Sequence, residues 1–117
     1  MRIEDLRHEI LTRIAVGAIV SGDELSAAEL ARTRVASPVR VREVLQGLIE
    51  AGALLDFGDD RYLLTAECAP IARSTLVADW ALELQTAVSR LVNAGCSKSE
   101  ISAHLEALIR SLEGNDE

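Results

Sequence analysis

The sequence has few aromatic residues. Only Phe57, Tyr62 and Trp80 are aromatic among 117 residues, although 49% of the chain is hydrophobic. A core must therefore be built from Ala, Val, Ile and Leu, which favours closely packed helices. At this length the chain forms one domain, or one small domain with an appendage.

Cysteine and histidine are also scarce. Cys68 and Cys96 lie far apart in the sequence and match no metal-binding or redox spacing, and His8 and His104 are equally isolated. We expect two reduced thiols, no metal site and no cofactor. The sequence holds no nucleophile–base set, no phosphate-binding loop and no paired catalytic carboxylates, so we do not expect an enzyme.

Two further absences concern the membrane. No apolar run approaches the length that a bilayer-spanning helix needs. The N-terminal stretch MRIEDLRHEI mixes acidic with basic residues and has no hydrophobic signal-peptide core. We therefore expect a soluble, cytoplasmic protein that has no membrane partner.

An excess of positive charge is missing as well. The net charge is −7, and residues 1–67 hold eight Arg against twelve Asp and Glu, a net charge of −4. Proteins that bind nucleic acid are usually basic over at least one face. Any DNA-binding surface must therefore be a local cluster of arginines rather than the field of the whole domain.

What the sequence does contain is a well-marked helix at Ser37–Gly52. Ser37 can cap its start through a side-chain hydrogen bond, Pro38 suits the first helical position, and Gly52 suits the stop. Its apolar positions recur at three- and four-residue spacing: Val41, Val44, Leu45, Leu48 and Ile49. Its other face is mixed and mostly polar: Val39, Arg40, Arg42, Glu43 and Gln46. The pattern predicts a helix that packs on a small core and presents a polar face outward.

Shorter elements precede this helix. A helix is predicted over residues 4–16, and a brief strand and turn over 18–25. The capping box Ser26–Glu29 starts a second short helix that runs to about Arg32. Two short helices joined by a few residues, the second amphipathic, are typical of a helix-turn-helix.

A β-hairpin is predicted directly after the helix-turn-helix. Residues 53–57 and 61–64 are strand-like, and Gly58–Asp60 lies between them as a turn. The predicted fold class is therefore mainly α with a small β wing, a winged helix-turn-helix, and we assign this DNA-binding domain to residues 1–67. A C-terminal helical hairpin follows it.

The C-terminal hairpin has an excess of apolar surface. One helix is predicted over 69–93, and a second capping box, Ser97–Glu100, opens the last helix. Together they are more apolar than a winged helix of about 65 residues can cover. We predict that residues 68–117 form a dimerisation tail in a two-fold homodimer, with Trp80 as a possible anchor. The predicted interface residues are Leu76, Trp80, Leu84, Val88, Leu91, Leu105, Leu108 and Leu112.

The alternative is that the hairpin folds back on the first helix of its own chain. Nothing in the charged residues of 69–112 specifies a small-molecule effector.

The first domain resembles the N-terminal domain of GntR-type transcription regulators. The resemblance runs from Ile19 to Leu64 and rests on these motifs: Gly22-Asp23-Glu24-Leu25, Ser26 with Glu29-Leu30-Ala31, Ser37 with Val41-Arg42-Glu43, and Leu48-Ile49-Glu50-Ala51-Gly52. The short tail, with Ala94-Gly95-Cys96-Ser97 between its helices, is similar to the compact ending of the YtrA-type subfamily. The resemblance implies DNA binding by the winged helix and dimerisation by the tail, without a roomy ligand pocket.

Several DNA-facing positions depart from the pattern of that family. Pro38 stands where the family usually has an arginine, Arg40 where it often has a threonine, and Ala28 where an arginine is common. The wing tip, Gly58–Tyr62, carries two aspartates in place of a basic residue. Arg42 is the one familiar contact that carries over directly.

The first functional hypothesis is a dimeric, sequence-specific transcription regulator, a repressor, that inserts helix 37–52 into the major groove of an operator. The side chains expected at base edges are Val39, Arg40, Arg42 and Gln46. Arg32, Arg34 and Arg61 are expected to bind phosphates, together with backbone N–H groups at the helix starts Ser26 and Ser37.

Solvent-exposed ion pairs offer a simpler account of the same arginines. Arg40 could pair with Glu43, and Arg32 with Glu29, as weak surface couples. Against this, four arginines lie together between residues 32 and 42 in a chain that is otherwise acidic.

A second hypothesis is a winged helix that has lost DNA binding and binds a protein partner instead. The low isoelectric point, Pro38, Ala28 and the two aspartates at the wing tip favour it.

Overall fold

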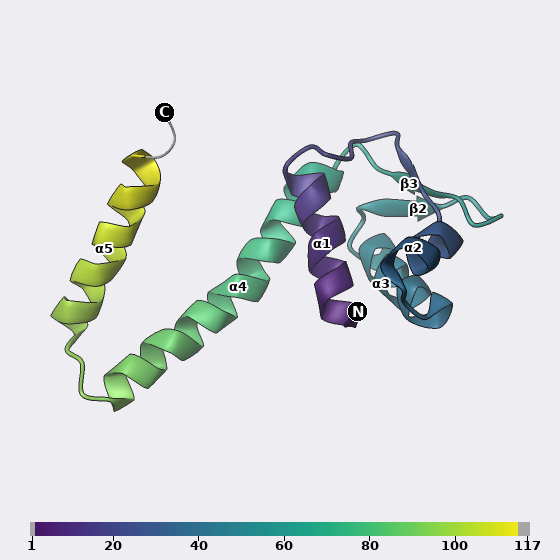
Figure 1. Ribbon diagram of the computed structural model, residues 1–117. Coiled ribbons are helices and arrows are strands. Elements are labelled where there is room, and N and C mark those ends of the chain that lie inside the picture. Colours follow the sequence, from purple (N-terminus) through teal and green to yellow (C-terminus); the bar gives the residue numbers. More distant parts are fainter. Residues whose placement is uncertain (1, 115–117) are drawn as a thin grey trace. The chain divides into compact units, whose positions relative to one another are not determined.

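The structure of the chain is a computed structural model that describes residues 2–114 (Figure 1). It is mainly α-helical with one small antiparallel sheet and a C-terminal helical part, which confirms the predicted fold class. The elements in chain order are α1 (Ile3–Ala15), β1 (Glu24–Leu25), α2 (Ala27–Arg34), α3 (Pro38–Glu50), β2 (Leu54–Asp56), β3 (Tyr62–Leu64), α4 (Cys68–Asn93) and α5 (Lys98–Gly114).

The chain forms two compact units, and the division falls after Ala78, within α4. We call the part up to Ala78 unit 1 and the part from Asp79 unit 2. The domain boundary predicted between residues 67 and 68 lies at the start of α4 and stays a prediction. Residues 1 and 115–117, which the predicted domains included, lie outside the described residues.

The core of unit 1 includes the first turns of α4, which explains why the boundary between the two units lies within that helix. Aliphatic side chains from α1, α3 and the sheet fill it, and its largest fully buried members are Leu6, Leu11, Ile14, Val41, Leu45, Leu54 and Leu64. The first turns of α4 complete this core with Cys68, Ala72 and Leu76. Leu76 is only 7% exposed and packs inside unit 1. Little of its side chain is left for a second copy to contact, and its place in a dimer interface stays a prediction.

The helix-turn-helix forms largely as its sequence predicts. Val41, Val44, Leu45 and Leu48 of α3 are buried. Gly52 has φ +90°, and its N–H and that of Ala53 bond back to the carbonyls of Ile49 and Leu48, which ends the helix.

The start of α3 differs from the prediction. Ser37 occupies the N-cap position with an extended backbone, but in the described structure its side chain makes no capping hydrogen bond. Pro38 follows at the first helical position, where its fixed φ suits a helix and its missing N–H leaves one donor fewer to satisfy. The Ser37 carbonyl accepts the Val41 N–H at 3.0 Å. The backbone thus starts this helix, and the serine hydroxyl stays exposed for other partners.

The wing is a short hairpin with a third strand beside it. β3 lies between β1 and β2, and it pairs antiparallel with both. Leu54 lies opposite Leu64 in the hairpin, and Leu25 lies opposite Tyr62 on the other side. At the tip, Gly58, Asp59 and Asp60 have φ of +79°, +54° and +59°. Three successive residues with positive φ turn the chain sharply between β2 and β3.

Unit 2 buries little of its apolar surface. Within its described residues, Ile101 of α5 is the only large apolar side chain that is buried. Most of the others are about half exposed or more: Trp80, Leu82, Leu84, Leu91, Val92, Leu108, Ile109 and Leu112. The serine cap of α5 forms as predicted, since Ser97 Oγ accepts the Glu100 N–H at 3.1 Å.

Candidate nucleic-acid interface

The outer face of α3 is exposed along its length. Val39, Arg40, Arg42 and Gln46 all point away from the core, and Val39 is 56% exposed. A shallow depression of about 490 Å³ follows this face and is lined by Val39, Arg42, Glu43, Gln46, Gly47 and Glu50. At Gly47 the surface is open, since nothing lies within 4 Å of the place where a Cβ would stand. We refer to Val39, Arg40, Arg42 and Gln46 as the outer face of α3.

The arginines on and beside this face are not neutralised by local ion pairs. Among the described residues, no carboxylate lies within ion-pair distance of Arg40 or Arg42, so Arg40 is not paired with Glu43. In the same part of the chain, Arg32 of α2 is likewise not paired with Glu29. These three guanidinium groups keep their hydrogen-bond donors for an external acceptor.

Arg34, at the end of α2, is held inside the protein instead. Its Nη2 and Nε lie 2.6 and 2.8 Å from Oε1 of Glu9 on α1, and its Nη1 donates to Thr33 Oγ1 at 3.0 Å. The side chain is 24% exposed, and the bond to Glu9 raises the pKa of Arg34. Arg34 therefore joins α2 to α1, and its charge is already balanced.

Arg61 of the wing is engaged in the same way. Its Nη2 and Nε lie 2.5 and 3.3 Å from the carboxylate oxygens of Glu24, the first residue of β1. The hydrogen bond from Arg61 lowers the pKa of Glu24, so the pair is ionised at neutral pH. Both side chains are about half exposed, and a strong external anion would compete with a carboxylate for this arginine.

The wing-tip residue Asp60 contacts the start of α2, which the sequence analysis did not predict. Its carboxylate accepts hydrogen bonds from Ser26 Oγ at 2.6 Å and from the N–H groups of Ala27 and Ala28 at 2.8 and 3.1 Å. These bonds, that of Ser26 first, hold the pKa of Asp60 below its ordinary value, and the nearby charge of Arg42 adds to the effect. The Ser26 Oγ in turn accepts the Glu29 N–H at 3.2 Å, as the capping box predicts.

This arrangement corrects one expectation about the start of α2. The N–H groups near Ser26 were expected to donate to DNA phosphates, but they already donate to Asp60. Asp59, by contrast, makes no side-chain hydrogen bond with the described residues, and of the two tip aspartates only Asp60 folds back on α2.

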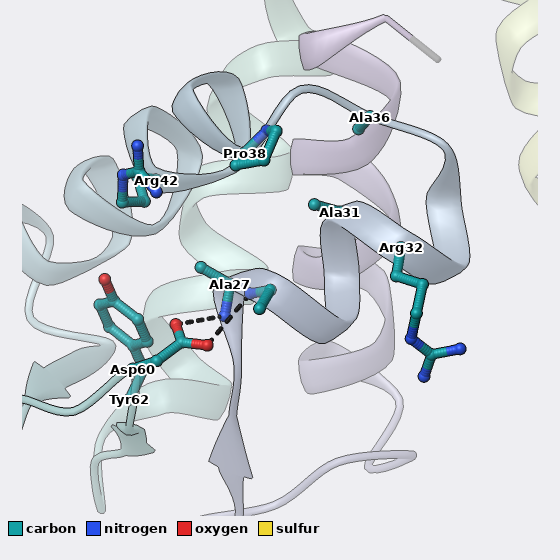
Figure 2. A pocket seen from close by; sticks show the side chains of 9 residues that line it. Ala27, Ala31, Arg32, Ala36, Pro38, Arg42, Asp60 and Tyr62 are labelled. Atoms are coloured by element: carbon teal, nitrogen blue, oxygen red, sulfur yellow. Dashed lines mark hydrogen bonds between the residues drawn. The ribbon is translucent and has the colours of Figure 1, made fainter.

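Asp60 lies in a hollow between α2, α3 and the wing. The hollow has a volume of about 690 Å³ (Figure 2). Its lining residues are Ala27, Ala28, Ala31, Arg32, Ala36, Pro38, Arg42, Asp60 and Tyr62. In Figure 2, Asp60 lies against the start of α2 with the Tyr62 ring beside it, and Arg42 comes from α3. We call this cavity the α2–α3 hollow. Arg32 and Arg42 both line it, although the guanidinium group of Arg32 points away from Arg42 in Figure 2, whereas Arg40, Arg34 and Arg61 do not line it.

Unit 2 has a groove of its own between α4 and α5. It has a volume of about 350 Å³ and is lined largely by aliphatic side chains. Five of the predicted dimer residues line it: Leu84, Val88, Leu91, Leu105 and Leu108. Glu100, His104 and Cys96 are its polar members. The remaining predicted residues, Trp80 and Leu112, are 48% and 65% exposed.

Metal-binding and membrane-spanning features are also absent from the described residues. Within the described residues, no three His, Cys, Asp or Glu side chains are grouped so that they could hold a metal ion, and both cysteines are free. None of the described helices is both long enough and apolar enough to span a membrane.

The fold is similar to that of solved transcription regulators. A GntR family transcriptional regulator from Listeria monocytogenes superposes with a TM-score of 0.68 at 22% identity, covering 90% of this chain and 92% of the other. A transcriptional regulator from Oenococcus oeni gives a TM-score of 0.71 at 17% identity, with 92% and 89% covered. YtrA from Sulfolobus acidocaldarius, a GntR-family transcription factor, gives 0.50 at 21% identity, with 95% and 90% covered.

These similarities extend over nearly the whole chain and include both units. No protein-family model matches the sequence, and no curated protein matches it either. The predicted resemblance to GntR-type regulators, YtrA among them, is thus confirmed in the fold.

Proposed function

We propose that this protein is a dimeric, sequence-specific DNA-binding transcription regulator, a cytoplasmic repressor that inserts α3 into the major groove. The observation that carries the proposal is the outer face of α3. It is exposed, it bears two arginines without ion pairs among the described residues, and it belongs to a fold that GntR-type regulators share.

The outer face has the chemistry that base edges require. Arg40 and Arg42 can donate two hydrogen bonds to guanine, Gln46 can pair with adenine, and Val39 can contact a thymine methyl group. The backbone of α3 is anchored by its buried side chains, so these groups are presented from a rigid element. A rigid presentation favours sequence discrimination, because little conformational freedom is lost on binding.

Phosphate contacts then come from a smaller set than the sequence suggested. Arg32 is available for a phosphate, and the exposed Ser37 hydroxyl at the start of α3 can donate to another. Arg34 and Arg61 would first have to leave Glu9 and Glu24. We therefore propose Arg32 and Ser37 as the main positioning contacts, with a weak dependence of affinity on salt.

Dimerisation is proposed through unit 2. Side chains such as Leu84, Leu91 and Leu108 line an open apolar groove, and Trp80 and Leu112 are exposed nearby in sequence. An exposed apolar surface of this extent is typical of an interface rather than of a free surface. A second copy of the chain is a suitable occupant, since a two-fold dimer pairs the same patch with itself.

The proposal is tested by footprinting the intergenic DNA upstream of the gene for this chain. Two protected half-sites with centres about one helical turn of DNA apart, or a multiple of it, are expected for a dimer. A folded dimer that protects no upstream sequence at low salt would contradict the proposal.

A protein-interaction module remains the second candidate, and specific contacts favour it. The two basic residues Arg34 and Arg61 are already matched by acidic partners, and Asp60 occupies the start of α2. Glu43 and Glu50 also flank the depression on α3. Failure to protect DNA, together with stable binding of a protein through the outer face of α3, would support this candidate.

A further inference from the structure

Asp60 supplies the one carboxylate among the residues that line the α2–α3 hollow. Three hydrogen bonds from Ser26, Ala27 and Ala28 hold it there, at 2.6 to 3.1 Å. The side chain is exposed to solvent, and these bonds tether its carboxylate to the first turn of α2. Its negative charge is a fixed part of this cavity.

The other members of the hollow are suited to a phosphate group. Arg42 supplies guanidinium donors and Tyr62 supplies a hydroxyl, whereas the guanidinium group of Arg32 points away from both in Figure 2. Ala27 and Ala31 have short side chains, which leave room for a sugar-phosphate backbone to approach (Figure 2). The hollow therefore combines two features that conflict, cationic donors that attract an anion and a carboxylate that repels it.

We infer that the α2–α3 hollow receives a phosphate of the DNA backbone beside Arg42, and that the fixed carboxylate of Asp60 weakens this contact. The inference rests on the proposed function. The contact is weakened in two ways. Asp60 repels the phosphate, and its negative charge also offsets part of the positive electrostatic potential of Arg42. Asp60 is thus a residue that limits DNA affinity, and its removal strengthens binding.

The neighbouring Asp59 provides a matched control. It lies in the same turn, it also has a left-handed φ of +54°, and it does not line the hollow. Asp59→Asn and Asp60→Asn change the net charge identically, from −7 to −6. Asparagine tolerates the left-handed conformation and can still cap a helix. Asp60→Gly is a second variant, which lacks the charge and suits the φ of +59°.

The experiment measures binding of the whole chain to a fluorescent duplex of the upstream DNA, about 30 base pairs long, by anisotropy. The titration is repeated at salt concentrations from about 50 to 200 mM, because a phosphate contact appears in the slope of log Kd against log salt. Thermal melts confirm that each variant is folded before it is titrated.

The inference predicts that Asp60→Asn and Asp60→Gly bind about three- to tenfold more tightly than the natural chain at low salt. Their salt dependence should be steeper by up to about one unit of slope, while Asp59→Asn changes affinity less than about twofold. Binding by the Asp60 variants where the natural chain does not bind would also support it.

Two results would overturn the inference while leaving the proposed function intact. One is a natural chain that binds and an Asp60→Asn variant that binds equally or more weakly. The other is an equal gain in Asp59→Asn, which would show a general effect of net charge. If neither the natural chain nor any variant binds the duplex, the proposed function itself fails and the inference fails with it.

Discussion

Arg42 lies where two surfaces meet, so its replacement tests the DNA-binding proposal in detail. It lines both the depression on α3 and the α2–α3 hollow. It is exposed and forms no ion pair with the described residues, so Arg42→Ala should change the free energy of unfolding by no more than about 0.5 kcal/mol. Any larger effect on DNA binding then reports on the interface and not on folding.

The two surfaces predict different signatures for Arg42→Ala. A bidentate contact with guanine would cost about 1–3 kcal/mol, or roughly five- to 150-fold in Kd, and would relax base preference at one position. A phosphate contact would weaken binding about equally for all sequences and lower the salt slope by about one. Titrations of the upstream duplex and of single-base variants, each at several salt concentrations, separate the two.

Arg73→Ala is the matched control for this measurement. Arg73 is an exposed arginine of α4 in the same unit, and it lines a different hollow, beside Gly17 and Ser21. It removes the same charge from another surface. The reasoning is refuted if Arg42→Ala binds as well as the natural chain, or if Arg73→Ala loses as much affinity.

Four further predictions concern stability and assembly. Leu45→Ala, at a site with no solvent exposure, should lower the free energy of unfolding by about 2–5 kcal/mol in urea titrations. Val35 has φ +51° and is 86% exposed, so Val35→Gly should raise the free energy of unfolding by about 1 kcal/mol, and a lower melting temperature would contradict this. Leu108→Asp should shift the chain from dimer to monomer in light scattering while the circular dichroism stays helical. Asp60 has a pKa below the ordinary 3.8, so its stabilising bonds are intact above about pH 4 and are lost as pH falls through the folded pKa; melts of Asp60→Asn should show a smaller loss on acidification.

The local elements of this fold could be predicted from the sequence because their causes are local. The apolar spacing of α3, the glycine that ends it and the serine caps at Ser26 and Ser97 each depend on residues within one or two turns. The hairpin likewise follows from two strand-like runs with a turn between them. The resemblance to GntR-type regulators rested on these same segments.

The fate of individual charged side chains could not be predicted in this way. Asp60 bonds to residues that precede it by more than thirty positions, and Arg34 bonds to Glu9 across 25. Such pairs form only when tertiary packing brings distant elements together, so no periodicity or spacing signals them. Leu76 shows the same limit for apolar residues. Its position on the apolar face of α4 follows from the sequence. Whether the core of its own chain or a second copy covers that part of the face depends on the tertiary fold.

The bonds of Asp60 also restrict how this protein can respond to a ligand. Asp60 bonds the wing to the start of α2. Arg61 bonds the wing to β1 through Glu24, and Arg34 bonds α2 to α1 through Glu9. We therefore expect the wing and α2, as the structure describes them, to move together when the protein binds a duplex. If two copies assemble as proposed, a ligand would control DNA binding by changing the distance and the angle between the two winged-helix units. Only certain distances and angles would let both α3 helices enter the major groove at the same time.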